Sequence, residues 1–175
     1  MPNWVRNTLQ ITGAPEVVSE CLASMGSPER ESEDDRLLDF ERVVSLPPDL
    51  RARLEVSSST EEEAWDRRSE VIGQWGTKWS AFQVTVERQP DGGGAIIKFD
   101  TAWTPPMPVI STLADRFPSL EFDFTYLDIQ APIAGRARRA PGGGWATIDA
   151  RFDDGFCDAA LDAKSGRWDL SSEAD

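Results

Sequence analysis

Histidine is absent from this 175-residue sequence. Without an imidazole, the chain lacks the commonest general base near neutral pH, and Ser-His-Asp or Cys-His catalytic sites are excluded. Cysteine is scarce, because only Cys21 and Cys157 occur, too far apart for a disulfide framework or a metal cluster. No run approaches the roughly 18 apolar residues of a membrane span, and residues 1–6 lack an apolar export core. We expect a cytoplasmic protein with no cofactor and no membrane contact.

Positive charge is also in short supply. The formal net charge is −13 and the pI is near 4.4. Such a charge repels the phosphate backbone, so nucleic acid is disfavoured as a partner, though not excluded. The same charge can attract a basic protein surface, including one that normally holds DNA or RNA, or it can serve only solubility. Seven Trp and eight Phe supply bulky material for one globular core.

The first quarter of the chain predicts a strand, a helix and a loop. Residues 4–12 alternate apolar and polar side chains, which is typical of a half-buried strand. Pro15 suits the first turn of a helix over 15–25, where apolar residues recur at helical spacing. Ser27 to Asp35 contains no large apolar residue, so we predict a poorly ordered loop there.

The rest of the chain predicts two helices and three further core strands. Helices are expected over about 60–74 and 106–116. Strands are expected near 81–88, 95–102 and 119–126, the first two joined by a glycine-rich hairpin turn. These elements give an α+β, ferredoxin-like order, β-α-β-β-α-β, in which two helices cover one face of a four-stranded antiparallel sheet.

Three segments lie outside this repeating order. Residues 27–78 form a long helical insertion after the first helix, and residues 132–152 are predicted to add a hairpin. The sequence is therefore interpreted as one domain over 1–152, followed by an acidic tail over 153–175. We predict that the last few residues of this tail are poorly ordered, because they bring almost nothing to bury.

Four uncommon strings carry a family resemblance. They are Pro2-Asn3-Trp4-Val5-Arg6-Asn7-Thr8-Leu9, Phe40-Glu41-Arg42-Val43-Val44-Ser45-Leu46-Pro47, Trp75-Gly76-Thr77-Lys78-Trp79-Ser80-Ala81 and Phe99-Asp100-Thr101-Ala102-Trp103-Thr104-Pro105-Pro106. Through them the chain resembles the YubB-type ferredoxin-like proteins of phages, prophages and conjugative plasmids. One departure is Val5, where many relatives are expected to have Cys. The resemblance implies a fold and a mobile-element context, and it names no substrate or catalytic residue.

The most distinctive candidate site lies within these strings. It combines Trp75, Lys78 and Trp79 with Asp100 and Trp103. As a binding site, the indoles would stack a base or anchor a protein. As scaffold, they would pin the insertion to the sheet, with Lys78 paired to Asp100 and indole nitrogens bonded to backbone. We favour the scaffold interpretation, in which the three Trp side chains are mostly buried and Trp79→Ala costs roughly 3–5 kcal/mol.

A second candidate is the basic segment that holds Arg136, Arg138 and Arg139, with Arg151 further along. Alternate residues of a strand share a face, so Arg136 and Arg138 would project together. They would either grip a phosphate or an acidic partner, or neutralise the acidic tail of the chain itself. The glycine-rich strings that end at Gly94 and Gly144 are explained by hairpin turns, because neither has the spacing of a phosphate-binding loop.

Three functions are compatible with these observations. The leading hypothesis is a non-enzymatic accessory protein of a mobile element that binds a host or element-encoded protein. Its more specific form is an acidic inhibitor of a host defence or nucleic-acid-binding protein. The second is a single-strand nucleic-acid binder that uses the open sheet face. The third is a histidine-free enzyme that uses Lys78 with Asp100. Protein binding predicts an exposed apolar or strongly acidic patch, and nucleic-acid binding requires an exposed aromatic-basic face. An enzyme needs a pocket that contains Lys78 or Asp100 with perturbed titration.

Overall fold

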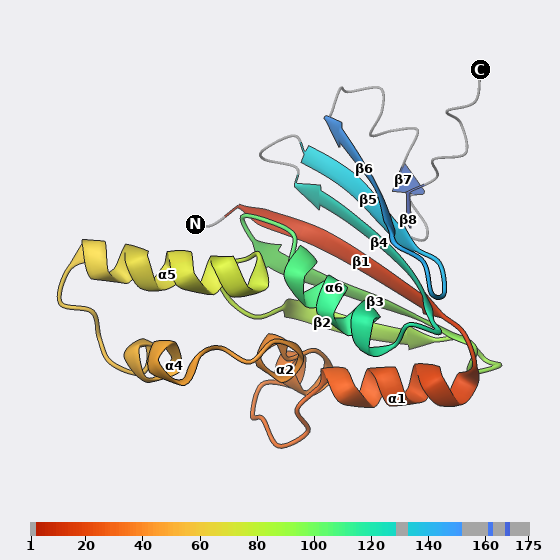
Figure 1. Cartoon of the computed structure of the whole chain (residues 1–175), viewed down its shortest axis with the longest axis horizontal. Coiled ribbons are helices and arrows are strands. Elements are labelled where there is room, and N and C mark those ends of the chain that lie inside the picture. Colours follow the sequence, from red (N-terminus) through yellow and green to blue (C-terminus); the bar gives the residue numbers. More distant parts are fainter. Residues whose placement is uncertain (1–2, 129–132, 152–160, 163–166, 169–175) are drawn as a thin grey trace.

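A six-stranded antiparallel sheet organises the protein (Figure 1). The computed structural model describes residues 3–128, 133–151, 161–162 and 167–168. The strand order is β2-β3-β1-β4-β5-β6. The strands are β1 (Trp4–Thr12), β2 (Phe82–Arg88), β3 (Gly94–Ala102), β4 (Glu121–Asp128), β5 (Ile133–Arg139) and β6 (Trp145–Arg151).

The core of this sheet has the ferredoxin-like arrangement that the sequence predicts. Helix α1 (Pro15–Met25) follows β1, and helix α6 (Met107–Arg116) follows β3. Strands β2, β3, β1 and β4 then lie side by side in the order of the split β-α-β-β-α-β fold. Phe82 and Asp100 are register partners, so the strands around Phe82 and Phe99 belong to one sheet, as predicted.

Strand alternation explains which sheet face is buried. On the central strand β1, Val5, Leu9 and Ile11 are almost fully buried, whereas Arg6 and Thr12 are exposed. Figure 1 shows α6 in front of the sheet, and α1 and α6 both contribute buried side chains to the same core. One face of the sheet is therefore packed beneath helices, and the opposite face carries the polar side chains of the alternation.

Four helices lie in the predicted insertion between α1 and β2. They are α2 (Glu33–Leu37), α3 (Phe40–Val43), α4 (Pro48–Leu54) and α5 (Glu61–Trp75). The hydroxyl of Thr60 accepts a hydrogen bond from the Glu63 amide and so caps α5. Arg53 on α4 makes two hydrogen bonds to Glu70 on α5, at 2.8 and 2.6 Å, which hold the two helices together. Figure 1 shows α5 extending past the end of the sheet.

The expectation for Ser27 to Asp35 needs correction. Ser27 is buried, and its hydroxyl donates to the Asp39 carboxylate at 2.7 Å. The carboxylate of Asp34, in the first turn of α2, accepts the backbone N–H of Val84 at 2.7 Å. The segment is attached to the domain by polar groups, whereas the sequence argument considered only apolar burial. The predicted featureless loop is therefore wrong.

The predicted extra hairpin is present and widens the sheet. Strand β5 pairs with β4, and β6 pairs with β5 through a turn in which Gly142 has a φ of 68°. The short strands β7 (Leu161–Asp162) and β8 (Arg167–Trp168) form a separate two-stranded sheet. The rest of the tail expected over 153–175 lies outside the described residues, as does Cys157. No helix in the described part combines the length and apolarity needed to cross a bilayer.

Candidate functional site

The uncommon sequence strings meet at one end of the sheet. The buried hydroxyl of Thr77 donates to the Ala102 carbonyl at 2.7 Å, and the hydroxyl of Thr104 donates to the Gly76 carbonyl. Gly76 ends α5 with a φ of 78°, and a Cβ there would lie 2.7 Å from Pro108. Glycine is therefore required by both conformation and space. These contacts join the Trp-Gly-Thr-Lys-Trp string to the Thr-Ala-Trp-x-Pro-Pro string as one structural unit.

The N-terminal string completes this unit. The buried side-chain amide of Asn7 donates to the Phe99 carbonyl at 3.3 Å and to the Thr101 hydroxyl at 2.9 Å. The Trp103 amide donates to the Asn3 carbonyl at 2.9 Å. Trp103 has a φ of 74°, a left-handed conformation that costs a bulky residue on the order of 1–3 kcal/mol. The surrounding hydrogen bonds thus fix Trp103 in a backbone position that it would not adopt alone.

One tryptophan of the candidate site is scaffold. Trp75 is 8% exposed, and its indole N–H donates to the Val44 carbonyl at 2.7 Å. The ring meets Phe40 edge-on with 6.0 Å between centroids, and Phe40 in turn meets Phe99 at 6.2 Å. The insertion is therefore pinned to the sheet through Trp75 and Phe40, as the scaffold interpretation predicts for this residue.

The other tryptophans contribute to an exposed line of rings, which we call the aromatic strip. It consists of Phe82, Trp4, Trp79, Trp103 and Trp65. Trp4 stacks on Phe82 at 5.3 Å and contacts Trp79 at 6.2 Å, while Trp103 contacts Trp65 on α5 at 6.2 Å. Trp79 is 38% exposed and Trp103 is only partly buried. The prediction that all three candidate tryptophans are mostly buried is therefore wrong, because Trp79 lies in the connection after α5, outside the core.

Lys78 joins the two halves of the strip. Its ammonium nitrogen lies 4.3 Å from the Trp79 ring centroid and 4.6 Å from that of Trp103, within cation–π distance of both. The ion pairs found among the described residues include none between Lys78 and Asp100, so the predicted pairing is not formed. Burial, with repulsion from Arg68, lowers the pKa of Lys78. Burial raises the pKa of Asp100, partly offset by Arg6.

The predicted basic patch is neutralised by its neighbouring strand. Arg136 donates to both carboxylate oxygens of Asp123, one of them at 2.8 Å. Arg138 donates to Glu121 at 2.9 Å, and both carboxylates lie on the same face of β4. Arg136 and Arg138 do project together as predicted, but they pair with β4. The role toward a partner or the acidic tail stays a prediction, because most of the tail lies outside the described residues.

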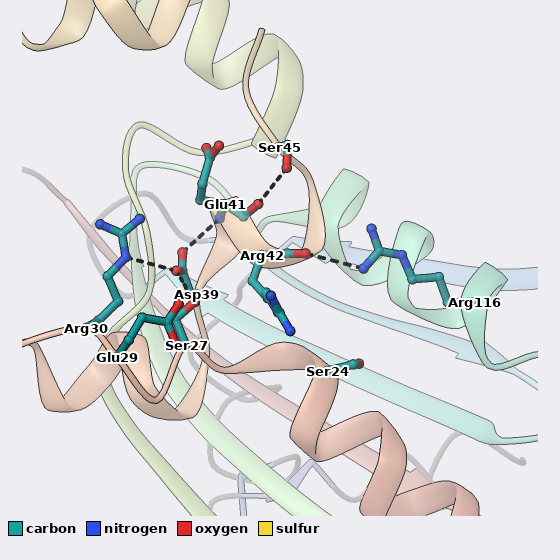
Figure 2. A pocket seen from close by; sticks show the side chains of 9 residues that line it. All are labelled: Ser24, Ser27, Glu29, Arg30, Asp39, Glu41, Arg42, Ser45 and Arg116. Atoms are coloured by element: carbon teal, nitrogen blue, oxygen red, sulfur yellow. Dashed lines mark hydrogen bonds and ion pairs between the residues drawn. The ribbon is translucent and has the colours of Figure 1, made fainter. Parts of the chain in front are cut away.

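A polar groove that the sequence reasoning missed opens on the helical side (Figure 2). Its volume is about 650 Å³. The lining residues come from α1, the following loop, α3 and the end of α6: Ser24, Ser27, Glu29, Arg30, Asp39, Glu41, Arg42, Ser45 and Arg116. No local motif unites these positions, so only the packing of α3 between α1 and α6 could reveal the groove.

The polar groups of this groove largely satisfy one another. Asp39 is buried and accepts from the Ser27 hydroxyl and the Glu41 amide, with Arg30 at 3.4 Å (Figure 2). Arg116 donates to the carbonyl of Arg42 at the end of α3. Three arginines and three carboxylates balance in charge. The arrangement stabilises the insertion, and neither Lys78 nor Asp100 lines it.

The described residues offer neither an activated cysteine nucleophile nor a metal-binding group. Burial raises the pKa of the Cys21 thiol to about 12, which keeps it protonated and poorly nucleophilic. No group of three His, Cys, Asp or Glu side chains in the described ranges is placed to hold a metal ion. Among the features described, the aromatic strip is therefore the strongest candidate for function, and its chemistry is that of a binding surface.

Comparisons with known proteins agree with this fold. A crystal structure of the protein api92 from Yersinia pseudotuberculosis is similar, with a TM-score of 0.58 and 12% sequence identity. The match covers 87% of this chain and 99% of that chain, and at such low identity it establishes the fold alone. No curated protein sequence matches the chain.

A family model extends the comparison beyond the fold. The model described as the ferredoxin-like domain in Api92-like protein matches residues 81–168, about half of the chain. The match begins two residues after the Trp-Gly-Thr-Lys-Trp string and includes β2 through β8. The chain therefore belongs to the family of Api92-like proteins with this ferredoxin-like domain.

Proposed function

We propose that this protein acts by binding another protein through the aromatic strip. The observation that carries the proposal is the exposure of the strip. Five large apolar side chains of the described residues are exposed, and three of them, Trp65, Trp79 and Phe82, lie in this line of rings. Aromatic side chains gathered on a surface are the usual anchors of protein interfaces, because each buries a large area with few rotatable bonds.

The strip is also rigid enough to act as an anchor. Trp4 belongs to the central strand β1, and Trp103 is fixed by its backbone hydrogen bond to Asn3. Ring-to-ring contacts of 5.3–6.2 Å restrict the remaining side chains. Because these rings are already ordered, a partner that covers them would bind with only a small entropy cost for ordering this surface.

The partner is proposed to be a protein encoded by a host or by a mobile element. The net charge of −13 favours a basic partner, including one that normally holds nucleic acid, since opposite charge speeds association and disfavours wrong partners. The resemblance to phage and plasmid proteins supports a role in establishment of an element in a host. In its more specific form, the proposal is that the protein inhibits a host defence protein.

A second candidate is single-stranded nucleic acid, favoured by one observation. Arg6 and Arg68 form none of the ion pairs found among the described residues, and neither does Lys78 beside the same rings. Aromatic rings flanked by cations are the usual elements of a single-strand site. Elsewhere on the open face, however, Lys98 pairs with Glu87, and Arg136 and Arg138 of β5 pair with carboxylates of β4. The overall charge opposes a phosphate backbone, so we place this candidate second.

Site-specific photo-crosslinking distinguishes these candidates. A photoreactive amino acid is placed at Trp79, or at the exposed Val56 outside the strip as a control, and the chain is expressed in cells. We expect a discrete protein adduct from position 79 and none from position 56, identified by mass spectrometry. The purified partner should then bind Trp79→Ala more weakly by at least about 2 kcal/mol, and Val56→Ala normally. An RNA or DNA adduct would favour the second candidate, and normal binding by Trp79→Ala would contradict the proposal.

A further inference from the structure

Lys78 occupies a position that suits a ligand. Its ammonium group lies over two indole rings at once, with centroids of Trp79 and Trp103 at 4.3 and 4.6 Å. We propose that the Trp79–Trp103 pair is a cation-binding site for a lysine or arginine side chain of the partner, and that Lys78 fills it in the free protein. This inference rests on the proposed function and adds the chemistry by which the strip recognises its partner.

Lys78 is held in this position only weakly. The ion pairs of the described residues do not include it, so the two rings are its identified electrostatic partners. Repulsion from Arg68 acts against its charge. A lysine side chain has a long flexible stem, and its ammonium group regains full hydration when it swings into water. Replacement of Lys78 by an incoming cation therefore exchanges one cation–π contact for another and breaks no salt bridge.

The two rings are positioned by contacts that do not involve Lys78. Trp103 is fixed by its amide hydrogen bond to Asn3 and by its contact with Trp65. Trp79 packs against Trp4, whose strand lies at the centre of the sheet. The space between the rings should therefore persist when Lys78 leaves. A site that survives loss of its internal occupant can accept an external one.

Charge complementarity indicates a basic occupant. The chain carries a net charge of −13, which attracts positively charged surfaces at long range. Glu61 and Glu62 lie one helical turn before Trp65, at the acidic start of α5 beside the strip. Arg68 opposes any cation in the site, but it opposes Lys78 equally, so the exchange leaves this repulsion unchanged. The indole faces themselves prefer cations over neutral or anionic groups.

The test uses choline as the probe and the full chain as the protein. Indole N–H resonances of Trp79 and Trp103 are followed by nuclear magnetic resonance during titration of wild type, Lys78→Ala and Lys98→Ala. Lys98→Ala is the matched control, because it removes one positive charge from the same protein outside the site. A second probe is the uncharged carbon isostere of choline, in which a tert-butyl group replaces the trimethylammonium group.

We expect choline to bind Lys78→Ala on the order of tenfold more tightly than wild type or Lys98→Ala, with both indole resonances shifting together. The uncharged isostere should not shift them. Equal binding to all three proteins, or equal binding of the isostere, would overturn the inference. Trp103→Ala, made in the Lys78→Ala background, should lose choline, and retention of binding would also overturn it. One result would separate the two proposals: Trp79→Ala fails to bind the partner identified by cross-linking, and choline fails to bind Lys78→Ala. In that case the strip remains the interface and only the cation site is wrong.

Discussion

Trp75 and Trp79 belong to the same five-residue string but have opposite environments. Trp75 is the last residue of α5, is 8% exposed, and donates its indole N–H to the Val44 carbonyl. Trp79 is 38% exposed, and its ring contacts Trp4 and the Lys78 ammonium group. The difference arises at Gly76, where the chain leaves the helix in a left-handed conformation. Identical side chains four residues apart thus serve the core and the surface.

This comparison separates two roles that one motif combines. The buried half of the string holds the insertion against the sheet, and the exposed half presents rings beside Lys78. Thr77 lies between them and ties the string to β3 through the Ala102 carbonyl. Substitutions should therefore divide into those that destabilise the fold and those that affect binding alone. The following experiments test that division, from the largest expected effect to the smallest.

Trp75→Ala should lower the free energy of unfolding by roughly 3–5 kcal/mol, the usual range for removal of a core aromatic side chain. The substitution leaves a cavity beside Phe40 and also removes the hydrogen bond to Val44. Urea unfolding followed by circular dichroism measures the loss. Trp75→Phe, which keeps most of the apolar area, should lose less than half as much. A loss below about 1 kcal/mol for Trp75→Ala would show that Trp75 is not part of the core.

Thr77→Val should lower the free energy of unfolding by about 1–2 kcal/mol. The substitution keeps the shape of the side chain but removes the buried hydroxyl that donates to the Ala102 carbonyl at 2.7 Å. Thermal and urea unfolding of the same sample provide the measurement, with exposed Thr85→Val as the control. If Thr77→Val is as stable as the wild type, the hydrogen bond does not join the two strings energetically.

Trp79→Ala should cost less than about 1 kcal/mol in stability while weakening partner binding. The side chain is exposed, so its removal leaves no enclosed cavity. The melting temperature and the affinity for the purified partner are compared with those of Trp75→Ala at equal protein concentration. A loss of stability as large as that of Trp75→Ala would remove the distinction between the two tryptophans and restore the scaffold interpretation for both.

Asp100→Asn should show a small, pH-dependent gain in stability. Burial raises the pKa of Asp100 above its ordinary value of 3.8, so the folded state binds its proton more tightly than the unfolded state does. The penalty from this carboxylate therefore grows as pH rises from the ordinary value through the raised folded-state value. We expect Asp100→Asn to be more stable than wild type at neutral pH and equal to it below about pH 3. Lower stability at neutral pH would show that attraction to Arg6 outweighs burial.

Periodicity was sufficient to predict the core strands and the helices α1 and α6. Alternation along Leu9 and Ile11, and along Phe122 and Phe124, identified strands that bury one face, and α1 begins at Pro15 as predicted. The segment 27–35 could not be predicted in this way, because its attachment depends on carboxylates that cap distant amides. Local composition contains no information about such partners.

Only part of the candidate site could be predicted from the sequence. The string Trp75 to Trp79 and the residues Asp100 and Trp103 were recognisable as unusual. In the structure Lys78 meets Trp79 and Trp103, whereas Trp75 packs in the core against Phe40. The participation of Trp4, Trp65 and Phe82 was not foreseen, because these residues lie far apart in the sequence and meet only across β1, α5 and β2.

By itself, the sequence determined the order of the core strands and of the two helices that cover them, and it contains the four strings that tie the insertion to the sheet. Those properties follow from local periodicity, capping and turn chemistry, which act over a few residues. Only the tertiary structure decided which rings are buried, which form the exposed strip, and that Lys78 pairs with indoles instead of with Asp100. Burial and cation–π contact depend on the direction in which the chain leaves Gly76 and on groups supplied by distant strands, so no local pattern could specify them.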